Sequence, residues 1–441
     1  MKSIEKTAER LKVDNLKSLE SENDKRRKSY EKFVIFICFL IYFAAQLGRY
    51  SYTSNINLFI ETKGVNKTQA GLVSTLYFLF YGAGQIINGI LCKRYNKRAA
   101  CLISVCLSSI LNAAAFFDIP FFWLYILWPL NAAAQSILYP SVMLTISEKV
   151  EKKYLAAASV IMASATTVGT FASYGISALF SLPQNFKYSF IIAAAVMTIA
   201  GIVWVFDCKK MQTSPEKSGV LTENKEENNA ENAKNVGNGK NENKNNLGIL
   251  AFIELSFFAF VSYAVNGGTG TWTPTIIKDL YGLSSGLSAF LSAFLPFFAI
   301  FNSIIAEIVY RKCKSFNKSS FVLFGGTAVF CLLVLPLINV NCGVLLALLA
   351  IIRLFSGAAT NLYTAKAPLY LADRCNAGFL SGFLNGLCYL GNAVSSFALG
   401  VIADNSGWNF VFIVFAVSSA LPLLCYPVYL KIVKNDQTKK L

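Results

Sequence analysis

The chain contains no histidine, and its 24 carboxylate side chains are outnumbered by 40 lysines and arginines. Without histidine it lacks the side chain that most often acts as general base, proton shuttle or metal ligand. Its 11 cysteines include no Cys-x-x-Cys pair. That spacing pattern indicates neither a zinc site nor a disulfide framework, and we interpret the cysteines as small apolar fillers. No metal or cofactor is expected.

Carboxylates are also missing from the middle of the long apolar runs. Glu254 and Glu307 lie only near run ends. Coupling to protons inside a membrane generally requires an acidic or histidine relay, so this absence argues against such coupling. The sequence also has no paired nucleophile and base, phosphate-binding loop or metal cluster, which argues against an enzyme.

What the chain has in abundance is apolar surface: 55% of its residues are hydrophobic, 36 are phenylalanine and only 15% are charged. This composition is typical of a polytopic membrane protein. Twelve apolar runs are long enough to cross a bilayer as helices. They are residues 33–60, 69–92, 98–117, 120–147, 155–181, 188–206, 249–273, 284–310, 319–338, 343–371, 377–402 and 409–431.

Lysine and arginine alternate between the loops that join these runs. One set of loops contains Lys93, Arg94, Lys97, Arg98, Lys149, Lys152, Lys153, Arg311, Lys312, Lys314, Lys318 and Arg374. The alternate set contains Lys63, Lys67, Lys187 and Lys278. By the positive-inside rule, both termini and the central linker are predicted to be cytoplasmic, in a multi-pass protein of the plasma (inner) membrane.

A polar central segment divides the twelve runs into six and six. Its asparagine-, lysine- and glutamate-rich composition predicts disorder. Similar glycine and arginine positions in the two halves favour two parallel repeats that face each other across a central cavity. The predicted domains are a cytoplasmic tail (1–32), a six-helix bundle (33–206), a disordered cytoplasmic linker (207–247), a second six-helix bundle (248–431) and a cytoplasmic tail (432–441). The fold class is therefore an all-α membrane protein with two pseudo-symmetric bundles.

Arg49 lies inside the first apolar run. A cation at membrane depth is costly and generally faces a protein interior or a water-filled substrate path, so we interpret Arg49 as a substrate ligand. The alternative is an arginine that reaches the membrane interface along the lipid-facing surface.

Several later runs have a single polar face. Asn131, Gln135 and Tyr139 follow helical spacing in the fourth run. The second run contains Tyr77, Tyr81, Gln85 and Asn88, and the eleventh contains Asn385, Tyr389 and Asn392. Polar faces in lipid turn toward other helices or water, so these predict a shared polar cavity, with interhelical hydrogen bonding as the alternative for each face.

The seventh run ends in three glycines, Gly267, Gly268 and Gly270, followed by Trp272 and Pro274. This sequence predicts a broken or bendable helix with a gating role. A plain helix end followed by a turn is the alternative.

Arg353 is the second cation at mid-depth, about ten residues into the tenth run. Two arginines that enter one cavity from opposite halves favour an anionic ligand such as a carboxylate or phosphate.

The layout resembles the major facilitator superfamily and, more narrowly, the organophosphate:phosphate antiporter family, which includes the glycerol-3-phosphate and hexose-6-phosphate transporters. The residues that support the resemblance are Arg49, Phe80-Tyr81-Gly82, Gly89 to Arg94, Gln135 with Pro140, Trp272-Thr273-Pro274, Tyr389-Leu390-Gly391 and Asp404 to Trp408. The loop after the second span resembles the superfamily's signature loop, here Gly89, Lys93, Arg94, Lys97 and Arg98.

The resemblance implies rocker-switch exchange, with arginines of the first and seventh spans on the phosphate. Arg49 matches the first arginine, but Asn266 stands at the second position and Gln85 replaces a family lysine. Lys93 stands where the family's signature loop has an acidic residue. One arginine among amides and tyrosines suits a singly charged or weakly anionic organic solute, and a further hypothesis is that Arg353 replaces the missing cation.

The sequence therefore predicts a secondary transporter that moves a small organic anion, phosphorylated or carboxylated, by alternating access. It is expected to be a monomer in the lipid bilayer with no nucleic-acid partner. The predicted substrate-binding residues are Arg49, Tyr52, Tyr81, Gln85, Gln135, Tyr139, Asn266, Arg353, Asn385 and Tyr389. The alternatives are a proton-coupled or neutral-solute carrier and a transporter-like membrane sensor.

Overall fold

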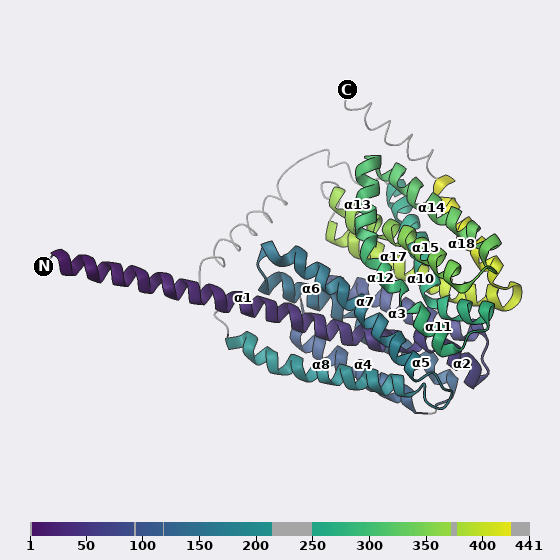
Figure 1. Cartoon of the computed structure of the whole chain (residues 1–441), viewed down its shortest axis with the longest axis horizontal. Coiled ribbons are helices and arrows are strands. Elements are labelled where there is room, and N and C mark those ends of the chain that lie inside the picture. The colour runs from purple at the N-terminus through teal and green to yellow at the C-terminus, as the bar shows by residue number, and fades with distance from the viewer. Residues whose placement is uncertain (1, 92–93, 118, 214–248, 372–376, 425–441) are drawn as a thin grey trace, which may run out of the picture.

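The computed structural model describes residues 2–91, 94–117, 119–213, 249–371 and 377–424. All regular structure in these residues is helical, as the composition predicts (Figure 1). The predicted linker beyond residue 213 and the predicted C-terminal tail lie outside the described residues.

The first half of the chain forms one group of helices. Its α-helices are α1 (Lys2–Ser54), α2 (Ile56–Lys63), α3 (Lys67–Leu91), α4 (Lys97–Phe116), α5 (Leu124–Ser136), α6 (Leu138–Lys149), α7 (Leu155–Leu179) and α8 (Tyr188–Thr213). Two short 3₁₀ helices, η1 (Phe121–Trp123) and η2 (Lys152–Tyr154), precede α5 and α7.

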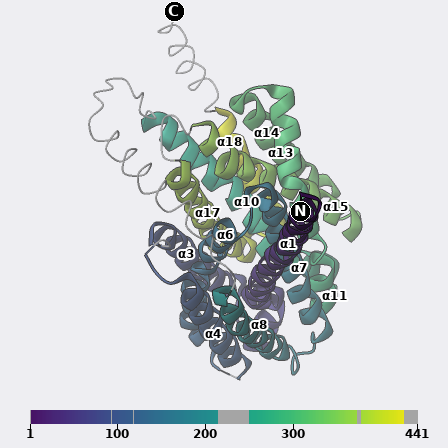
Figure 2. The ribbon, with the colours of Figure 1, turned by 90° about the vertical axis from the view of Figure 1, so that its left-hand side faces the viewer.

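The second half forms the other group. Its helices are α10 (Ile249–Tyr281), α11 (Ser285–Ser292), α12 (Leu295–Phe298), η3 (Ala299–Phe301), α13 (Asn302–Cys313), α14 (Phe316–Leu337), α15 (Cys342–Asn361), the π-turn η4 (Leu362–Lys366), α16 (Ala367–Tyr370), α17 (Ala377–Ser406) and α18 (Trp408–Leu424). Figure 2 shows α4 and α8 on one side of the molecule and α14 and α18 on the other.

Ten helical segments of the described chain are long and apolar enough to span a membrane. The helices α7 and α18 lie where the fifth and twelfth spans were predicted. Four predicted spans cover more than one helix: α1 with α2, α5 with α6, α11 to α13, and α15 to α16.

Three helices extend well beyond the sequence-based limits, and α10 is one of them because it continues past residue 273 to Tyr281. The helix α1 is continuous from Lys2 to Ser54, so residue 32 marks no break between a tail and the first span. The helix α8 likewise continues to Thr213, into the first residues of the predicted linker. Hydropathy locates the apolar part of a helix and cannot locate its charged extension, because charged residues also favour helix.

The two groups of helices meet along α3 and α17, which pack closely. Gly82 lies against Tyr389, where an added β-carbon would be 3.0 Å from the Tyr389 Cβ. A β-carbon on Gly386 would lie 2.5 Å from Ile86, and one on Gly71 would collide with the backbone of Ser396. Small residues let helix backbones approach in a membrane, where the hydrophobic effect does not drive helices together.

Charged residues join the two groups at the end of the bundle where α3 begins and α10 ends. Lys67 Nζ lies 3.1 Å from Asp279 Oδ2 and 3.9 Å from Asp404 Oδ1. The Thr68 hydroxyl and backbone N–H donate to Asp404 Oδ2 at 2.7 and 2.8 Å. The start of α3 is therefore tied to both α10 and α17.

A second ion pair crosses between the groups beside the first. Lys278 of α10 pairs with Glu61 of α2, and the Ser285 hydroxyl donates to Glu61 Oε1 at 2.8 Å. Trp408 Nε1 donates to Asp279 Oδ2 at 3.0 Å. We call the charged residues Glu61, Lys67, Lys278, Asp279 and Asp404 the clasp.

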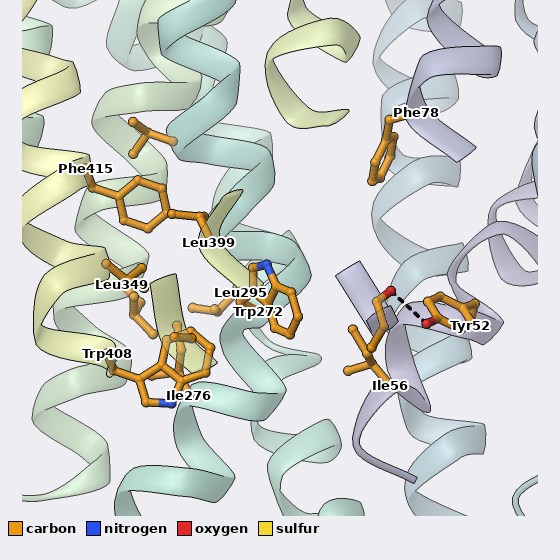
Figure 3. Packing of buried hydrophobic residues seen from close by; sticks show 14 of the residues in the cluster. Tyr52, Ile56, Phe78, Trp272, Ile276, Leu295, Leu349, Leu399, Trp408 and Phe415 are labelled. Atoms are coloured by element: carbon orange, nitrogen blue, oxygen red, sulfur yellow. Dashed lines mark hydrogen bonds between the residues drawn. The ribbon is translucent and has the colours of Figure 1, made fainter. Parts of the chain in front are cut away.

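An apolar core lies next to the clasp and includes residues of both groups. Figure 3 shows Trp272, Ile276 and Trp408 on the side of the second group, and Tyr52 and Phe78 across from them. The Trp272 and Trp408 rings are 6.0 Å apart.

Candidate functional site

A cavity of about 180 Å³ lies where the two groups of helices meet. From the first group it is lined by Tyr50, Phe78, Thr166, Thr167, Thr170 and Tyr174. From the second group it is lined by Tyr263, Asn266, Gly267, Gly270, Thr271, Thr273, Ser292, Leu295, Pro296, Ala299, Asn302, Arg353 and Asn392. Hydroxyls and amides dominate its polar lining, and no aspartate or glutamate is among these lining residues.

Arg353 of α15 is the charged residue of this lining. Its guanidinium packs against the backbone of Gly270, where a β-carbon would collide with Nη1. Among the described residues no carboxylate pairs with Arg353. Its positive charge therefore borders the cavity with no carboxylate counter-ion in the described part of the chain.

Asn266 of α10 is connected to the same stretch of α15. Its amide nitrogen donates to the Arg353 backbone carbonyl at 2.9 Å and to Ser356 Oγ at 3.3 Å. Asn266 is only 7% exposed. Asn266 thus lies directly beside Arg353.

The helix α10 is continuous through the three glycines, so it is neither broken nor ended there, and the predicted bending and gating role remains a prediction. Pro274 has no N–H to donate to the carbonyl four residues earlier, that of Gly270. The Tyr174 hydroxyl of α7 donates to this carbonyl instead, at 3.3 Å. A side chain from the other half thus compensates for the proline.

The glycines of α10 admit neighbouring side chains. A β-carbon on Gly267 would collide with the Asn392 amide, and one on Gly268 would lie 2.8 Å from Leu399. Together with Gly270, these positions let α10 lie close to α15 and α17. Trp272 is fully buried and donates from Nε1 to Ser396 O at 3.1 Å.

Arg49 lies in the protein interior, 6% exposed, which excludes the lipid-facing alternative. Its guanidinium carbon is 3.9 Å from the centre of the Tyr81 ring. Its Nε donates to Gln135 Oε1 at 3.4 Å, an oxygen that also accepts from the Tyr77 hydroxyl at 3.0 Å. Aromatic faces attract cations, more strongly away from water.

A hydrogen-bond network orients the amide that contacts Arg49. Gln135 Nε2 donates to Ser108 Oγ at 2.8 Å and to Asn131 Oδ1 at 3.3 Å. Ser108 Oγ donates to Asn131 Oδ1 at 2.5 Å. All three residues are fully buried. The predicted polar face of the fourth span therefore forms interhelical bonds in this structure.

A series of tyrosine rings in contact runs from Arg49 to the cavity. Tyr81 packs edge-on against Tyr389, with ring centres 4.7 Å apart. Tyr389 packs against Tyr263 at 5.6 Å, and Tyr263 lines the cavity. Arg49 itself is not a lining residue.

A sequence model of the Major Facilitator Superfamily matches residues 38–347, well over half of the chain. The chain belongs to the major facilitator superfamily. The predicted superfamily resemblance and its all-α membrane fold are confirmed.

Relatives of this major facilitator are distant. The Membrane sensor protein UhpC of Escherichia coli (strain K12) is 21% identical over 199 residues, which span 45% of this chain and 45% of that protein. A POT family transporter in complex with 5-aminolevulinic acid has a TM-score of 0.68 at 15% identity, over 89% of this chain and 96% of that chain. A D-xylose-proton symporter has a TM-score of 0.67 at 12% identity, over 89% and 96% of the two chains.

The predicted ligands of this major facilitator fall into separate environments. Asn266 and Arg353 line the cavity. Tyr81 and Gln135 contact Arg49, and Tyr389 packs against Tyr81. Gln85 donates to the Tyr81 hydroxyl at 2.7 Å.

Three other predicted ligands do not line the cavity. The Tyr52 hydroxyl donates to Ala70 O at 2.8 Å inside the apolar core (Figure 3). The Tyr139 ring lies 5.4 Å from Tyr42, and Asn385 is half-buried on α17.

The predicted signature loop also lies away from the cavity. Lys97 pairs with Glu148 at 2.5 Å, and the Arg98 carbonyl accepts a hydrogen bond from Trp204 at 3.0 Å. Arg94 is exposed in a turn, and Gly89 belongs to α3. Lys93 lies outside the described residues.

Sequence reasoning missed several lining residues. Tyr50 is one of them, although it follows Arg49 directly. Asn392 was not missed, because it belongs to the predicted polar face of the eleventh run and does line the cavity. Asn302 is a lone amide in the eighth span, a weaker signal. Nothing in the sequence indicates that α7 would contribute Tyr174.

Proposed function

We propose that this major facilitator is a secondary transporter that moves a small organic anion across the plasma membrane by alternating access. The two six-helix groups would rock about the cavity between them. In this proposal Arg353 holds the anionic group of the substrate, with Asn266 positioning the backbone of Arg353.

The observation that carries the proposal is the Arg353 guanidinium, which borders the cavity with no carboxylate partner among the described residues. A cation inside a membrane protein is generally paired, and one that faces a void instead is available to an anionic ligand. This supports the hypothesis that Arg353 replaces the cation missing at Asn266. The predicted ligand role of Arg49 remains a prediction, because Arg49 is not among the residues that line this cavity.

The distribution of basic residues supports the predicted orientation, with both termini cytoplasmic. The clasp would then be at the extracellular end. Its ion pairs connect the two groups of helices at that end. We therefore assign to this structure a state closed at the extracellular end.

The cavity lining supports exchange over proton coupling. Its described residues include no acidic side chain that could take up a proton with the substrate. Such a relay is the usual requirement for coupling to protons.

Transport in proteoliposomes tests the proposal. Purified protein would first be screened by thermal shift against carboxylates and phosphate monoesters, because a ligand that binds the native state raises its apparent stability. Counterflow of a labelled binder should then be saturable, insensitive to an uncoupler and lost in Arg353→Gln. Flux that collapses with the uncoupler contradicts exchange, and flux unchanged in Arg353→Gln contradicts the assigned anion site.

A membrane sensor is the second candidate function. Its support is the likeness to a protein named as a membrane sensor, over 45% of each chain. Binding of the same ligand without any counterflow, in vesicles where a known carrier is active, would favour the sensor.

A further inference from the structure

A groove of about 350 Å³ lies between α1 and α7, on the surface of the first group of helices. It is lined by Lys32, Ile35, Phe36 and Phe39 of α1 and by Ile161 of α7. The four α1 residues follow the spacing i, i+3, i+4 and i+7, which places them on one face of the helix. Phe36 and Ile161 are 58% and 38% exposed, and Lys32 is also exposed, so the groove is open to its surroundings.

The groove faces away from the central cavity. Thr170 of α7 lines that cavity, and Ile161 lies nine residues earlier on the same helix. Nine residues correspond to about two and a half turns, so the two side chains leave α7 on opposite faces. The α1 residues beyond Lys32 are apolar and belong to the first candidate span, so acyl chains rather than water surround this face.

A close helix contact fixes the level of the groove in the membrane. A β-carbon on Gly169 of α7 would lie 2.8 Å from the Phe43 carbonyl oxygen of α1. Phe36 and Ile161 lie seven and eight residues before Phe43 and Gly169, about two turns toward the N-terminal ends of the two helices. In the predicted orientation these ends are cytoplasmic, so the groove lies in the cytoplasmic half of the bilayer.

Lys32 gives the groove a positive charge at its cytoplasmic end. It directly precedes the apolar run that begins at Phe33, so its ammonium reaches the level of the lipid headgroups. No carboxylate in the described part of the chain forms an ion pair with Lys32. The acidic residues of the neighbouring elements, Glu31 and Glu151, pair with Arg27 at 3.4 and 2.7 Å. The charge of Lys32 is therefore available to an anion at the membrane surface.

We propose that this groove binds a phospholipid of the cytoplasmic leaflet whose headgroup has a net negative charge. Its phosphate lies against Lys32, and one acyl chain lies along Phe36 and Phe39 against Ile161. The rise from Lys32 to Phe39 is about 10 Å, which fits within the roughly 15 Å of hydrocarbon in one leaflet. A lysine at the membrane surface favours an anionic over a zwitterionic lipid, because it repels the cationic group of the latter. The site is separate from the central cavity, so the inference does not depend on the proposed function.

Lipid titration of the delipidated full-length protein in detergent tests the inference. Phosphatidylglycerol, which carries one negative charge, is compared with phosphatidylcholine of the same acyl chains. A lipid that binds the native state raises the thermal unfolding midpoint, and the concentration dependence of this rise gives the apparent affinity. We expect phosphatidylglycerol to bind about fivefold more tightly, the effect of one lysine near an anionic surface. Equal affinities would overturn the inference.

Substitutions at Lys32 assign the preference to the groove. Lys32→Gln should abolish the preference for phosphatidylglycerol, whereas Lys32→Arg should keep it because the charge is retained. Without lipid, Lys32→Gln should unfold at the wild-type midpoint, because the side chain is exposed. Lys318→Gln is the matched control and should keep the preference, since Lys318 is an exposed lysine near the start of α14 and outside the groove lining.

The contact with the acyl chain is tested separately. Phe36→Ala removes an exposed apolar side chain of the groove and should weaken the binding of both lipids about threefold while keeping the preference. Phe410→Ala, an exposed phenylalanine of α18, should weaken neither. A preference that survives Lys32→Gln, or lipid affinities unchanged in Phe36→Ala, would overturn the inference. If counterflow fails while these results hold, the proposed function fails and the lipid site stands.

Discussion

Arg49 and Arg353 both lie inside the helical bundle, and neither pairs with a carboxylate among the described residues. Their surroundings differ in one respect. Arg49 is enclosed, with its guanidinium over the Tyr81 ring and its Nε bonded to Gln135. Arg353 borders a cavity. The comparison teaches that depth in the membrane does not by itself identify a ligand-binding cation, because aromatic rings and amides can also stabilise one.

Removing the cavity cation should have the largest effect on function. In Arg353→Gln, we expect affinity for an anionic solute to fall about a hundredfold, equivalent to about 2.7 kcal/mol, because no other charged residue lines the cavity. Isothermal titration in nanodiscs would measure it. Arg311→Gln, an exposed arginine paired with Glu307, is the control and should retain wild-type affinity. Unchanged affinity in Arg353→Gln would remove the distinction between the two arginines.

Changing the enclosed cation should act on stability instead. Arg49→Lys keeps the charge but loses the planar group that stacks on Tyr81 and bonds Gln135, so we expect the unfolding free energy to fall by about 2 kcal/mol. Thermal unfolding would show a lower midpoint, while ligand affinity changes less than that of Arg353→Gln. Arg94→Lys, exposed in a turn, should leave the midpoint unchanged. Loss of binding at an unchanged midpoint would instead make Arg49 a ligand, as the sequence predicts.

The smallest effect concerns the backbone behind Arg353. Tyr174→Phe leaves the Gly270 carbonyl without its donor, which should lower the unfolding free energy by about 1 kcal/mol. Pro274→Ala supplies the missing backbone N–H, so the double variant should recover most of the loss. A double-mutant cycle on thermal stability measures this coupling. If the two losses of unfolding free energy were additive, Tyr174 and Pro274 would not share this carbonyl. Tyr188→Phe serves as the control for the loss of a tyrosine hydroxyl.

Much of the architecture could be predicted because membrane spans carry a long local signal. Hydropathy places every described span within several residues, and the burial of Arg49 was correctly anticipated. The helix is unbroken at Gly267 to Gly270, and the donor that compensates for Pro274 there is Tyr174, which is 96 residues from Gly270 in sequence. No local pattern contains that contact. The placement of Asn266 beside Arg353 likewise depends on how α10 packs on α15, and the extension of α1 depends on helix propensity rather than hydropathy.

The clasp has a consequence for the solutions in which this protein is studied. The side chains of Lys67 and Asp404 remain 23% and 20% exposed, so dissolved ions reach them. The Debye screening length is about 8 Å at physiological ionic strength and shorter at higher salt concentration, so salt weakens the attraction between such exposed charges. Raising sodium chloride should therefore loosen the tie between the halves. A pair of fluorophores, one beside Glu61 and one beside Lys278, would then report a larger distance between the two groups of helices in high salt, with no solute added.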